Sequence, residues 1–213
     1  MIGVWSYTVI LTYIGLASAI TGVAFSILYA TGEVAAIGIP VLCLLFSGFC
    51  DMFDGRIARS KKNRTEREKQ FGIQIDSLCD VICFGVLPAS ISICLGGNRV
   101  LGIISAVLLI LAGVVRLAFF NVIEMERRSD PDNKDTNYTG LPITSSALIV
   151  PILFCFKGLI GQNFATFYQI VIIITAILFI TKINIRKPGS KEVYIIAATG
   201  IIIAIVLGIL SKF

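Results

Sequence analysis

Long apolar runs, interrupted by short polar segments, cover most of this 213-residue chain. A helix that crosses a membrane needs roughly 20 mostly apolar residues, and runs of that length recur along the whole sequence. By this criterion the sequence predicts seven spans, at residues 6–29, 34–55, 72–95, 99–123, 141–160, 163–183 and 192–211. We therefore expect an all-α fold, a polytopic transmembrane bundle of about seven helices that forms a single domain over residues 1–213.

The overall composition agrees with this pattern and narrows the chemistry. Hydrophobic residues make up 56% of the chain and charged residues 15%, which is more apolar side chain than a soluble domain of this size can bury. Histidine is absent from the sequence, which excludes Ser-His-Asp and Cys-His catalysis and zinc sites of the H-E-x-x-H type. Any proton transfer must then use a carboxylate, lysine, tyrosine or cysteine. The six cysteines lie in apolar runs without zinc-type spacing, so we expect neither disulfides nor a structural metal.

Lysine and arginine are distributed very unevenly between the connections. The connections after the second, fourth and sixth predicted spans contain 14 of the 18 basic residues, whereas those on the opposite side contain only Arg99, Lys157 and Lys212. Short loops rich in Lys and Arg stay in the cytoplasm. We therefore expect a multi-pass protein of the cell membrane with a cytoplasmic N-terminus. The net charge of +5 then reflects this topology and anionic lipid head groups, and nucleic-acid binding is not expected.

Four aspartates lie at or inside the cytoplasmic ends of the second and third predicted spans. They form two pairs at helical spacing, each on one helix face: Asp51 with Asp54, and Asp76 with Asp80. One charge at such a depth costs several kcal/mol, and four mutually repelling carboxylates cost more. A bound divalent cation, Mg²⁺ or Mn²⁺, would offset the repulsion because clustered carboxylate oxygens are hard ligands. The simpler alternative is that the aspartates form ion pairs with the nearby Arg56, Arg59 and Lys69.

Small and basic residues beside these aspartates indicate a phosphorylated ligand. Gly55 directly follows Asp54, and Gly72 lies one helical turn before Asp76, so bare backbone is expected on the face that carries the carboxylates. Arg59, four residues after Gly55, can bind a phosphate through two parallel hydrogen bonds. Metal ligands, bare backbone and an arginine together are typical of a site for a diphosphate.

These residues stand in an order that resembles a known signature. The segments Asp51-x-x-Asp54-Gly55-x-x-Ala58-Arg59 and Gly72-x-x-x-Asp76-x-x-x-Asp80 contain all eight signature residues of the CDP-alcohol phosphotransferases, the integral membrane enzymes of phospholipid head-group synthesis. Twelve residues, 60–71, separate the two segments, where many members of that family have about eight. The resemblance implies a six-helix core, here with one extra helix, and a homodimer.

A second stretch is similar to one branch of this family. The segment from Arg116 to Asn121, RLAFFN, resembles the R-L-A-R-F-N segment of the phosphatidylserine synthases, and the segment from Thr139 to Pro142, TGLP, resembles their F-x-G-L-P segment. Phe119 replaces the second arginine, and a threonine replaces the phenylalanine. The resemblance favours serine over glycerol phosphate or inositol phosphate as the acceptor.

The family resemblance also implies a role for each site residue. The expected reaction moves a phosphatidyl-type group from a CDP-linked lipid, of the CDP-diacylglycerol or CDP-archaeol type, to the hydroxyl of L-serine and releases CMP. Two divalent ions, Mg²⁺ or Mn²⁺, would be held by Asp51, Asp54, Asp76 and Asp80. The CDP group of the lipid would lie among Asp51, Gly55, Ala58, Arg59 and Gly72. Asp80 would act as the general base, and Arg116 and Asn121 would bind the acceptor.

Alternatives remain for the function and for Arg116. A cation-coupled transporter would also place acids in the membrane, but these acids cluster at one membrane face, and no paired broken helices indicate an inverted repeat. Within the same family the acceptor could be glycerol 3-phosphate or inositol phosphate. Such an acceptor would need further arginines, and Arg116 is the only basic residue that lies deep within a predicted span, away from its ends. Arg116 could instead pair with an acid of the cluster, such as Asp80.

Overall fold

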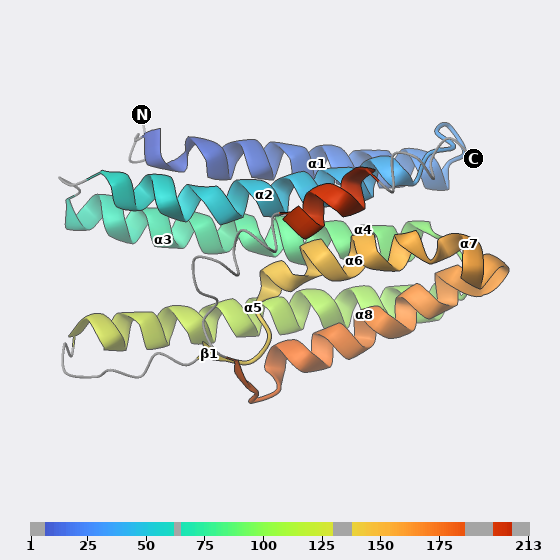
Figure 1. Cartoon of the computed structure of the whole chain (residues 1–213). Coiled ribbons are helices and arrows are strands. Elements are labelled where there is room, and N and C mark those ends of the chain that lie inside the picture. Colours follow the sequence, from blue (N-terminus) through green and yellow to red (C-terminus); the bar gives the residue numbers. More distant parts are fainter. Residues whose placement is uncertain (1–6, 62–64, 130–137, 186–197, 206–213) are drawn as a thin grey trace.

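The computed structural model describes residues 7–61, 65–129, 138–185 and 198–205. The helices labelled in Figure 1 are α1 (Ile10–Ala30), α2 (Gly38–Ser60), α3 (Glu66–Asp80), α4 (Leu87–Cys94), α5 (Arg99–Ser129), α6 (Ser146–Cys155), α7 (Lys157–Ile160) and α8 (Phe164–Ile180). A π-helical turn, Val81–Val86, joins α3 to α4, and residues 198–205 are also helical. Short 3-10 turns precede α1, α6 and α8, at Tyr7–Val9, Ile143–Ser145 and Gly161–Asn163. Two short strands, β1 (Tyr138–Thr139) and β2 (Asn184–Ile185), pair antiparallel.

Five helical segments in the described part of the chain are long and apolar enough to cross a membrane, which confirms the multi-pass helical bundle. They are Tyr7–Ala30, Gly38–Ala58, Glu66–Cys94, Arg99–Glu126 and Lys157–Ile180, with a shorter apolar helix at Ile143–Cys155. These segments correspond to the first six predicted spans. Of the seventh, at 192–211, only residues 198–205 are described, and they form a helix.

Several helix ends differ from the predicted ones because helices continue beyond the apolar core of a membrane. The third helix begins at Glu66 instead of residue 72, where a capping box starts it. Thr65 Oγ1 accepts a hydrogen bond from the Glu68 N–H at 3.2 Å, and Glu68 Oε2 accepts one from the Thr65 N–H at 3.0 Å. In the same way α5 extends to Ser129, six residues past the predicted end. The fifth predicted span is shorter than expected, because α6 ends at Cys155.

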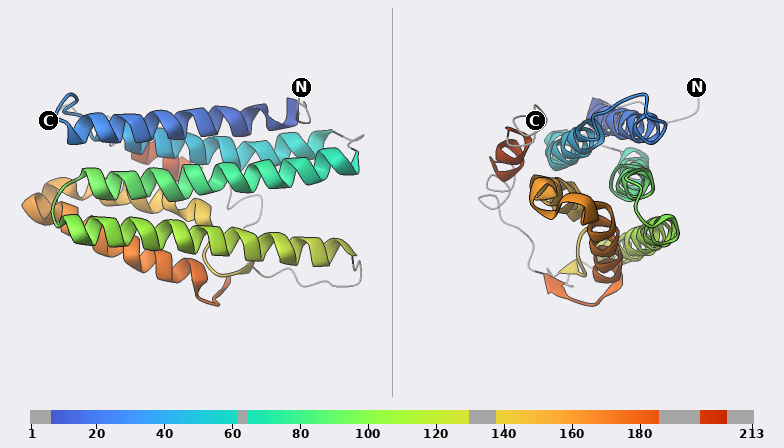
Figure 2. Two further views of the ribbon diagram at one scale, coloured as in Figure 1. Left: turned by 180° about the vertical axis from the view of Figure 1, so that it is seen from behind. Right: turned by 90° about the vertical axis from the view of Figure 1, so that its right-hand side faces the viewer.

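The helices form a bundle whose two sides are linked through α4 and α6. The pair α1 and α2 packs on one side and the pair α5 and α8 on the other (Figure 1). Seen end-on, the continuous α3–α4 helix lies between the two pairs, where α4 contacts α1 and α5, and α6 lies against α2 (Figure 2). Buried side chains such as Phe84, Leu87 and Tyr168 fill the interior. The outer face of α5 exposes Ile103 and Leu111, as a lipid-facing helix surface would.

Candidate active site

Three carboxylates from two helices meet inside this bundle. Asp51 comes from α2, whereas Asp76 and Asp80 come from consecutive turns of α3, whose last residue is Asp80. One carboxylate oxygen of each residue lies within 4.8 Å of those of the other two. Each of the three residues is half-buried. The structure therefore brings together three of the four aspartates that the sequence singled out, and we call them the carboxylate trio.

The spacing of the trio suits a divalent cation. Oxygen ligands about 2.1 Å from a common ion lie about 3 Å apart when adjacent and about 4.2 Å apart when opposite. Three oxygens within 4.8 Å of one another can thus contact one ion after small side-chain rotations. Carboxylates are also the donors that Mg²⁺ and Mn²⁺ prefer. Both the geometry and the donor type fit the metal that the sequence predicts here.

The fourth aspartate, Asp54, lies one helical turn after Asp51 on α2 and is only 6% exposed. Its Oδ2 accepts a hydrogen bond from Thr12 Oγ1 on α1 at 2.8 Å. Asp54 lies outside the trio, but it lines the same pocket as Asp51 and Asp80. All four aspartates therefore belong to one acidic site, in which Asp54 has a hydrogen-bond donor from a third helix.

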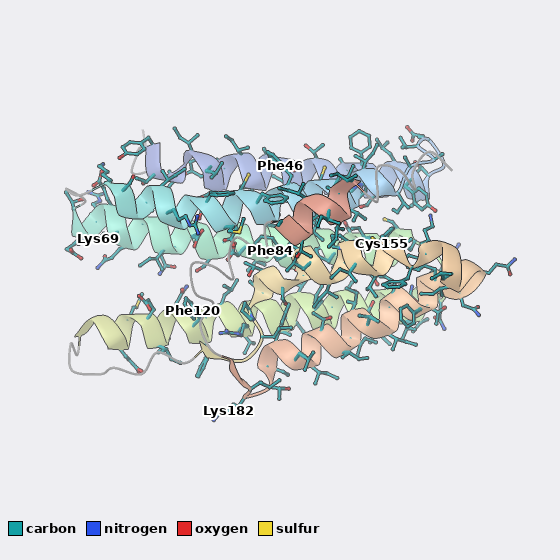
Figure 3. The ribbon with its side chains drawn as sticks, viewed as in Figure 1. Phe46, Lys69, Phe84, Phe120, Cys155 and Lys182 are labelled. Carbon is teal, nitrogen blue, oxygen red and sulfur yellow. The ribbon has the colours of Figure 1, made fainter. Side chains whose placement is uncertain are left out.

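A small pocket extends from the carboxylates into the bundle between α1, α2 and the turn after α3. Its walls combine acidic side chains with small, polar and thiol groups: Thr12, Gly15, Ser47, Cys50, Asp51, Asp54, Cys79, Asp80, Cys83 and Phe84. Asp80 faces this pocket and Asp76 does not line it. Phe84, labelled in Figure 3, contributes the aromatic wall. All six cysteines are free, as the sequence predicts.

The backbone changes its helical pitch directly after Asp80. The π-helical turn Val81–Val86 follows the last residue of α3, and such wide turns often occur at functional sites. The hydroxyl of Ser146 on α6 donates a hydrogen bond to the Phe84 carbonyl oxygen at 2.9 Å, within this turn. Because Ser146 is fully buried, this bond ties the turn to the bundle interior and so helps to fix the backbone next to Asp80.

The residues expected around the CDP group lie toward the C-terminal end of α2 and the N-terminal end of α3. We call these two ends, which lie away from the bundle interior, the outer helix ends. Gly55 and Ala58 follow the aspartates in the last turns of α2, and Gly72 precedes Asp76 in α3. The two ends lie on the same side of the bundle (Figure 1). Arg59 belongs to the last turn of α2 as well, and its side chain is outside the described part of the structure.

Basic residues near the outer end have contacts other than the carboxylate trio. Lys69, labelled in Figure 3, forms an ion pair with Glu66, 2.5 Å between Nζ and Oε1. The Arg56 guanidinium lies 5.8 Å from the centre of the Phe53 ring. Because Lys69 has an acidic partner on its own helix, the alternative that it neutralises the aspartates receives no support.

Arg116 connects the two segments that resemble one branch of the family. Its Nε donates a hydrogen bond to the Leu141 carbonyl at 3.1 Å and its Nη2 one to the Gly140 carbonyl at 3.4 Å. Arg116 is 6% exposed, and its guanidinium lies 5.8 Å from the centre of the Phe120 ring. The two hydrogen bonds from Arg116 anchor the start of the segment that leads into α6.

Gly140 has a conformation that explains why glycine occupies this position. Its φ is +85°, and a Cβ there would lie 3.1 Å from the Phe179 carbonyl and 3.2 Å from the Thr181 carbonyl. Its N–H donates to the Ile183 carbonyl at 2.7 Å. The close approach of residues 179–183 therefore leaves no room for a side chain at Gly140.

Asn121, the second expected acceptor-binding residue, reaches the acidic helix from α5. Its Nδ2 donates to Ser77 Oγ at 3.0 Å, and Ser77 directly follows Asp76. Asn121 is therefore hydrogen-bonded to the helix that carries two members of the trio. The sequence predicted Asn121 as a site residue by resemblance alone.

Sequence reasoning missed Thr12, because a lone threonine in an apolar helix is usually a packing residue. A signal was nevertheless present in the pattern of α1. Its buried residues are all small and recur at intervals of three and four, at Thr12, Gly15, Ala19, Gly22 and Ser26. Such a stripe predicts close approach of another helix, and close approach lets a short hydroxyl side chain reach a carboxylate.

The chain is similar to a known protein family and to several named proteins. The family model described as CDP-alcohol phosphatidyltransferase matches residues 5–182. The chain is 36% identical over 120 residues to the CDP-diacylglycerol–serine O-phosphatidyltransferase of Saccharomyces cerevisiae. The matched region is 54% of this chain and 42% of the yeast protein. It is 31% identical over 175 residues to the enzyme of the same name from Helicobacter pylori, with coverage of 79% and 67%. An archaetidylserine synthase from Methanothermobacter thermautotrophicus is 32% identical over 158 residues, with coverage of 74% and 61%. The matched regions thus span 42% to 67% of these three relatives.

Proposed function

This chain belongs to the CDP-alcohol phosphatidyltransferase family, and we propose that it transfers a phosphatidyl-type group from a CDP-linked lipid to the hydroxyl of L-serine, with release of CMP. The relatives from yeast and Helicobacter pylori are named for transfer to serine, and the archaeal relative is named for archaetidylserine. Serine is therefore the acceptor that these names favour. The carboxylate trio is the observation that carries the proposal, because family chemistry at a diphosphate needs a cluster of metal-ligating carboxylates.

The bonds that change are those at the lipid-side phosphorus. The serine hydroxyl oxygen attacks this phosphorus, a new P–O bond forms, and the P–O bond to CMP breaks. Two divalent ions, Mg²⁺ or Mn²⁺, would neutralise the charge on the diphosphate when bound. The carboxylates of Asp51, Asp54, Asp76 and Asp80 would hold them. Phosphoryl transfer depends mainly on positioning and charge neutralisation, which is what this set of carboxylates provides.

The proton of the serine hydroxyl passes to Asp80 in this mechanism. Asp80 is the innermost member of the trio along α3, and it is the member of the α3 pair that lines the pocket. The π-helical turn that follows it is held by Ser146. An acceptor that approached from within the bundle would thus meet the Asp80 carboxylate from the side opposite to the outer helix ends. A chain without histidine must use a group of this type as its base.

The substrates would occupy opposite sides of the carboxylates. We place the CDP group at the outer helix ends, among Gly55, Ala58, Arg59 and Gly72, together with Asp51. For the serine acceptor we retain Arg116, which would bind its carboxylate, and Asn121, which would hydrogen-bond the same head group. The bond from Asn121 to Ser77 brings α5 next to the acidic helix. The uneven distribution of basic residues supports a cytoplasmic site in the cell membrane, and the family likeness supports a homodimer.

Acceptor choice tests the proposal. Purified full-length protein is given CDP-diacylglycerol or its ether-linked counterpart, Mn²⁺, and one labelled acceptor: serine, glycerol 3-phosphate or inositol phosphate. We expect label in the lipid fraction with serine alone, in equal amount to the CMP released. The control is Glu33→Gln, which removes an exposed carboxylate outside the site and should behave like the parent.

Other outcomes separate the alternatives. Efficient labelling from glycerol 3-phosphate or inositol phosphate would overturn the choice of serine and keep the transferase. If no acceptor gives a labelled lipid and the protein instead moves a cation across liposomes, the transporter alternative replaces the enzyme.

A further inference from the structure

Thr12 joins α1 to the acidic site through one short, buried hydrogen bond. Its Oγ1 lies 2.8 Å from Asp54 Oδ2, and only 8% of Thr12 and 6% of Asp54 is exposed. A hydrogen bond from a hydroxyl to a carboxylate is charge-assisted and roughly twice as strong as one between neutral groups. Thr12 is far from the signature segments in the sequence, and it lines the same pocket as Asp51 and Asp80.

The bond can form because α1 and α2 approach closely at small residues. A Cβ at Gly15, one turn after Thr12, would lie 3.1 Å from the Cys50 Cβ. A Cβ at Gly22 would lie 2.9 Å from the Cys43 Cβ. The two helices run side by side over this length (Figure 1). The short side chain of Thr12 can therefore span the gap to α2.

Two further hydrogen bonds fix the register of α1 along α2. Ser47 Oγ on α2 donates to the Gly15 carbonyl at 2.8 Å, and Ser18 Oγ on α1 donates to the Cys43 carbonyl at 3.2 Å. Sliding of one helix past the other would break both bonds. The height of the Thr12 hydroxyl relative to α2 is thus set by contacts that do not involve the acidic site.

We propose that Thr12 is a positioning residue for the metal site, whose hydroxyl holds Oδ2 of Asp54 so that Oδ1 is presented to a divalent cation at the carboxylate trio. The inference rests on the metal-dependent transfer proposed above. Asp54 lies outside the trio, so its orientation decides whether it joins the trio in binding. A donor that fixes one oxygen of a ligand typically changes metal affinity by about 10-fold to 100-fold when it is removed.

A merely structural role for Thr12 predicts something different. The hydroxyl would then satisfy a buried carboxylate, and its loss would lower thermal stability without changing metal affinity. Metal affinity measured without turnover separates the two roles. The matched variants are Thr12→Val, which keeps the shape and removes the donor, and Thr12→Ser, which keeps the donor. Thr21→Val makes the same change at an exposed position of α1, where the hydroxyl bonds to the Ala17 carbonyl.

The experiment titrates the purified full-length proteins with Mn²⁺ and follows free Mn²⁺ by electron paramagnetic resonance, with and without CMP. Thr12→Val should bind Mn²⁺ about 10-fold or more weakly than the parent. Thr12→Ser should stay within about threefold of the parent, and Thr21→Val should match it. Excess Mn²⁺ should restore much of the lost turnover of Thr12→Val. If Thr12→Val does not fold, Thr12→Ala replaces it.

Equal Mn²⁺ affinity of Thr12→Val and the parent, with a lower melting temperature for the variant, would overturn the positioning role. Absence of Mn²⁺ binding by the parent under both conditions would overturn it as well. A parent that binds Mn²⁺ but transfers no lipid group to serine contradicts the proposed function instead, and the comparison of Mn²⁺ affinities then still decides the role of Thr12.

Discussion

Replacing Asp76 by asparagine should stabilise the metal-free protein while it destroys the metal site. The oxygens of the trio lie within 4.8 Å of one another. At that distance two ionised carboxylates repel by about 3.5 kcal/mol with an effective dielectric constant of about 20. Asp76→Asn removes two such repulsions. Protonation and solvent screening relieve much of this repulsion in the parent. If one third of the two repulsions remains, its removal stabilises Asp76→Asn by about 2 kcal/mol. This gain corresponds to a melting temperature about 4–8 °C above that of the parent.

Bound metal should reverse this order of stability, so that the parent melts above Asp76→Asn. A cation present at about 100 times its dissociation constant adds about 2.7 kcal/mol to the stability of a protein that binds it. Parent protein should therefore melt several degrees higher in Mn²⁺ than in chelator, whereas Asp76→Asn should melt at the same temperature in both. Thermal unfolding can be followed with a thiol-reactive dye, because the six cysteines are free and three of them are buried. Glu33→Gln, which removes an exposed carboxylate, is the control and should respond to Mn²⁺ like the parent.

The reasoning would be refuted if Asp76→Asn melted below the parent in chelator. That result would mean that the Asp76 carboxylate stabilises the metal-free fold through partners of its own. A variant that kept the full stabilisation by Mn²⁺ would equally contradict the role of this carboxylate as a ligand.

Three further outcomes are expected. Asp80→Asn should lower kcat by about 100-fold or more, because it removes the base, while binding of CDP-lipid, measured by displacement of a labelled analogue, stays near that of the parent; near-normal turnover would assign the base elsewhere. Gly140→Ala should lower the melting temperature more than Gly32→Ala, since both have positive φ, which costs about 1–3 kcal/mol, but only Gly140 has carbonyls at 3.1 and 3.2 Å from the added Cβ; equal losses would contradict the contact. In intact cells, Lys157→Cys should react with an impermeant thiol reagent and Lys69→Cys should not, and the reverse pattern would invert the topology.

The apolar pattern predicted the helices well and their ends less well, for a physical reason. Hydropathy detects the part of a helix that lies in lipid, whereas a helix ends where its backbone hydrogen bonds end. The first turns of α3 are polar, and the capping box between Thr65 and Glu68 starts them outside the apolar run. Prediction of this helix start would have required recognition of the capping box, which hydropathy does not detect.

The acidic site was predictable because helical periodicity and the signature both depend on local spacing. Asp76 and Asp80 share a helix face by geometry alone, and repulsion between the aspartates already indicated a cation. The bond from Thr12 to Asp54 depends on how closely two helices pack. The contacts of Arg116 with the Gly140 and Leu141 carbonyls depend on a turn far along the chain. The spacing of small residues in α1 indicates that another helix approaches closely, but it does not identify the bond from Thr12. Local spacing gives no indication of the Arg116 contacts.

The most direct test of the account is metal-dependent transfer to serine by the parent and Asp51→Asn, measured side by side. Purified protein with CDP-lipid and labelled serine should release one CMP for each labelled lipid formed in Mn²⁺ or Mg²⁺, stop in chelator, and resume when the metal is restored. Asp51→Asn removes a member of the trio and should form no labelled lipid at any metal concentration. Full serine transfer by the parent in excess chelator, or normal transfer by Asp51→Asn, would contradict the claim that the carboxylate trio holds the metal on which the reaction depends.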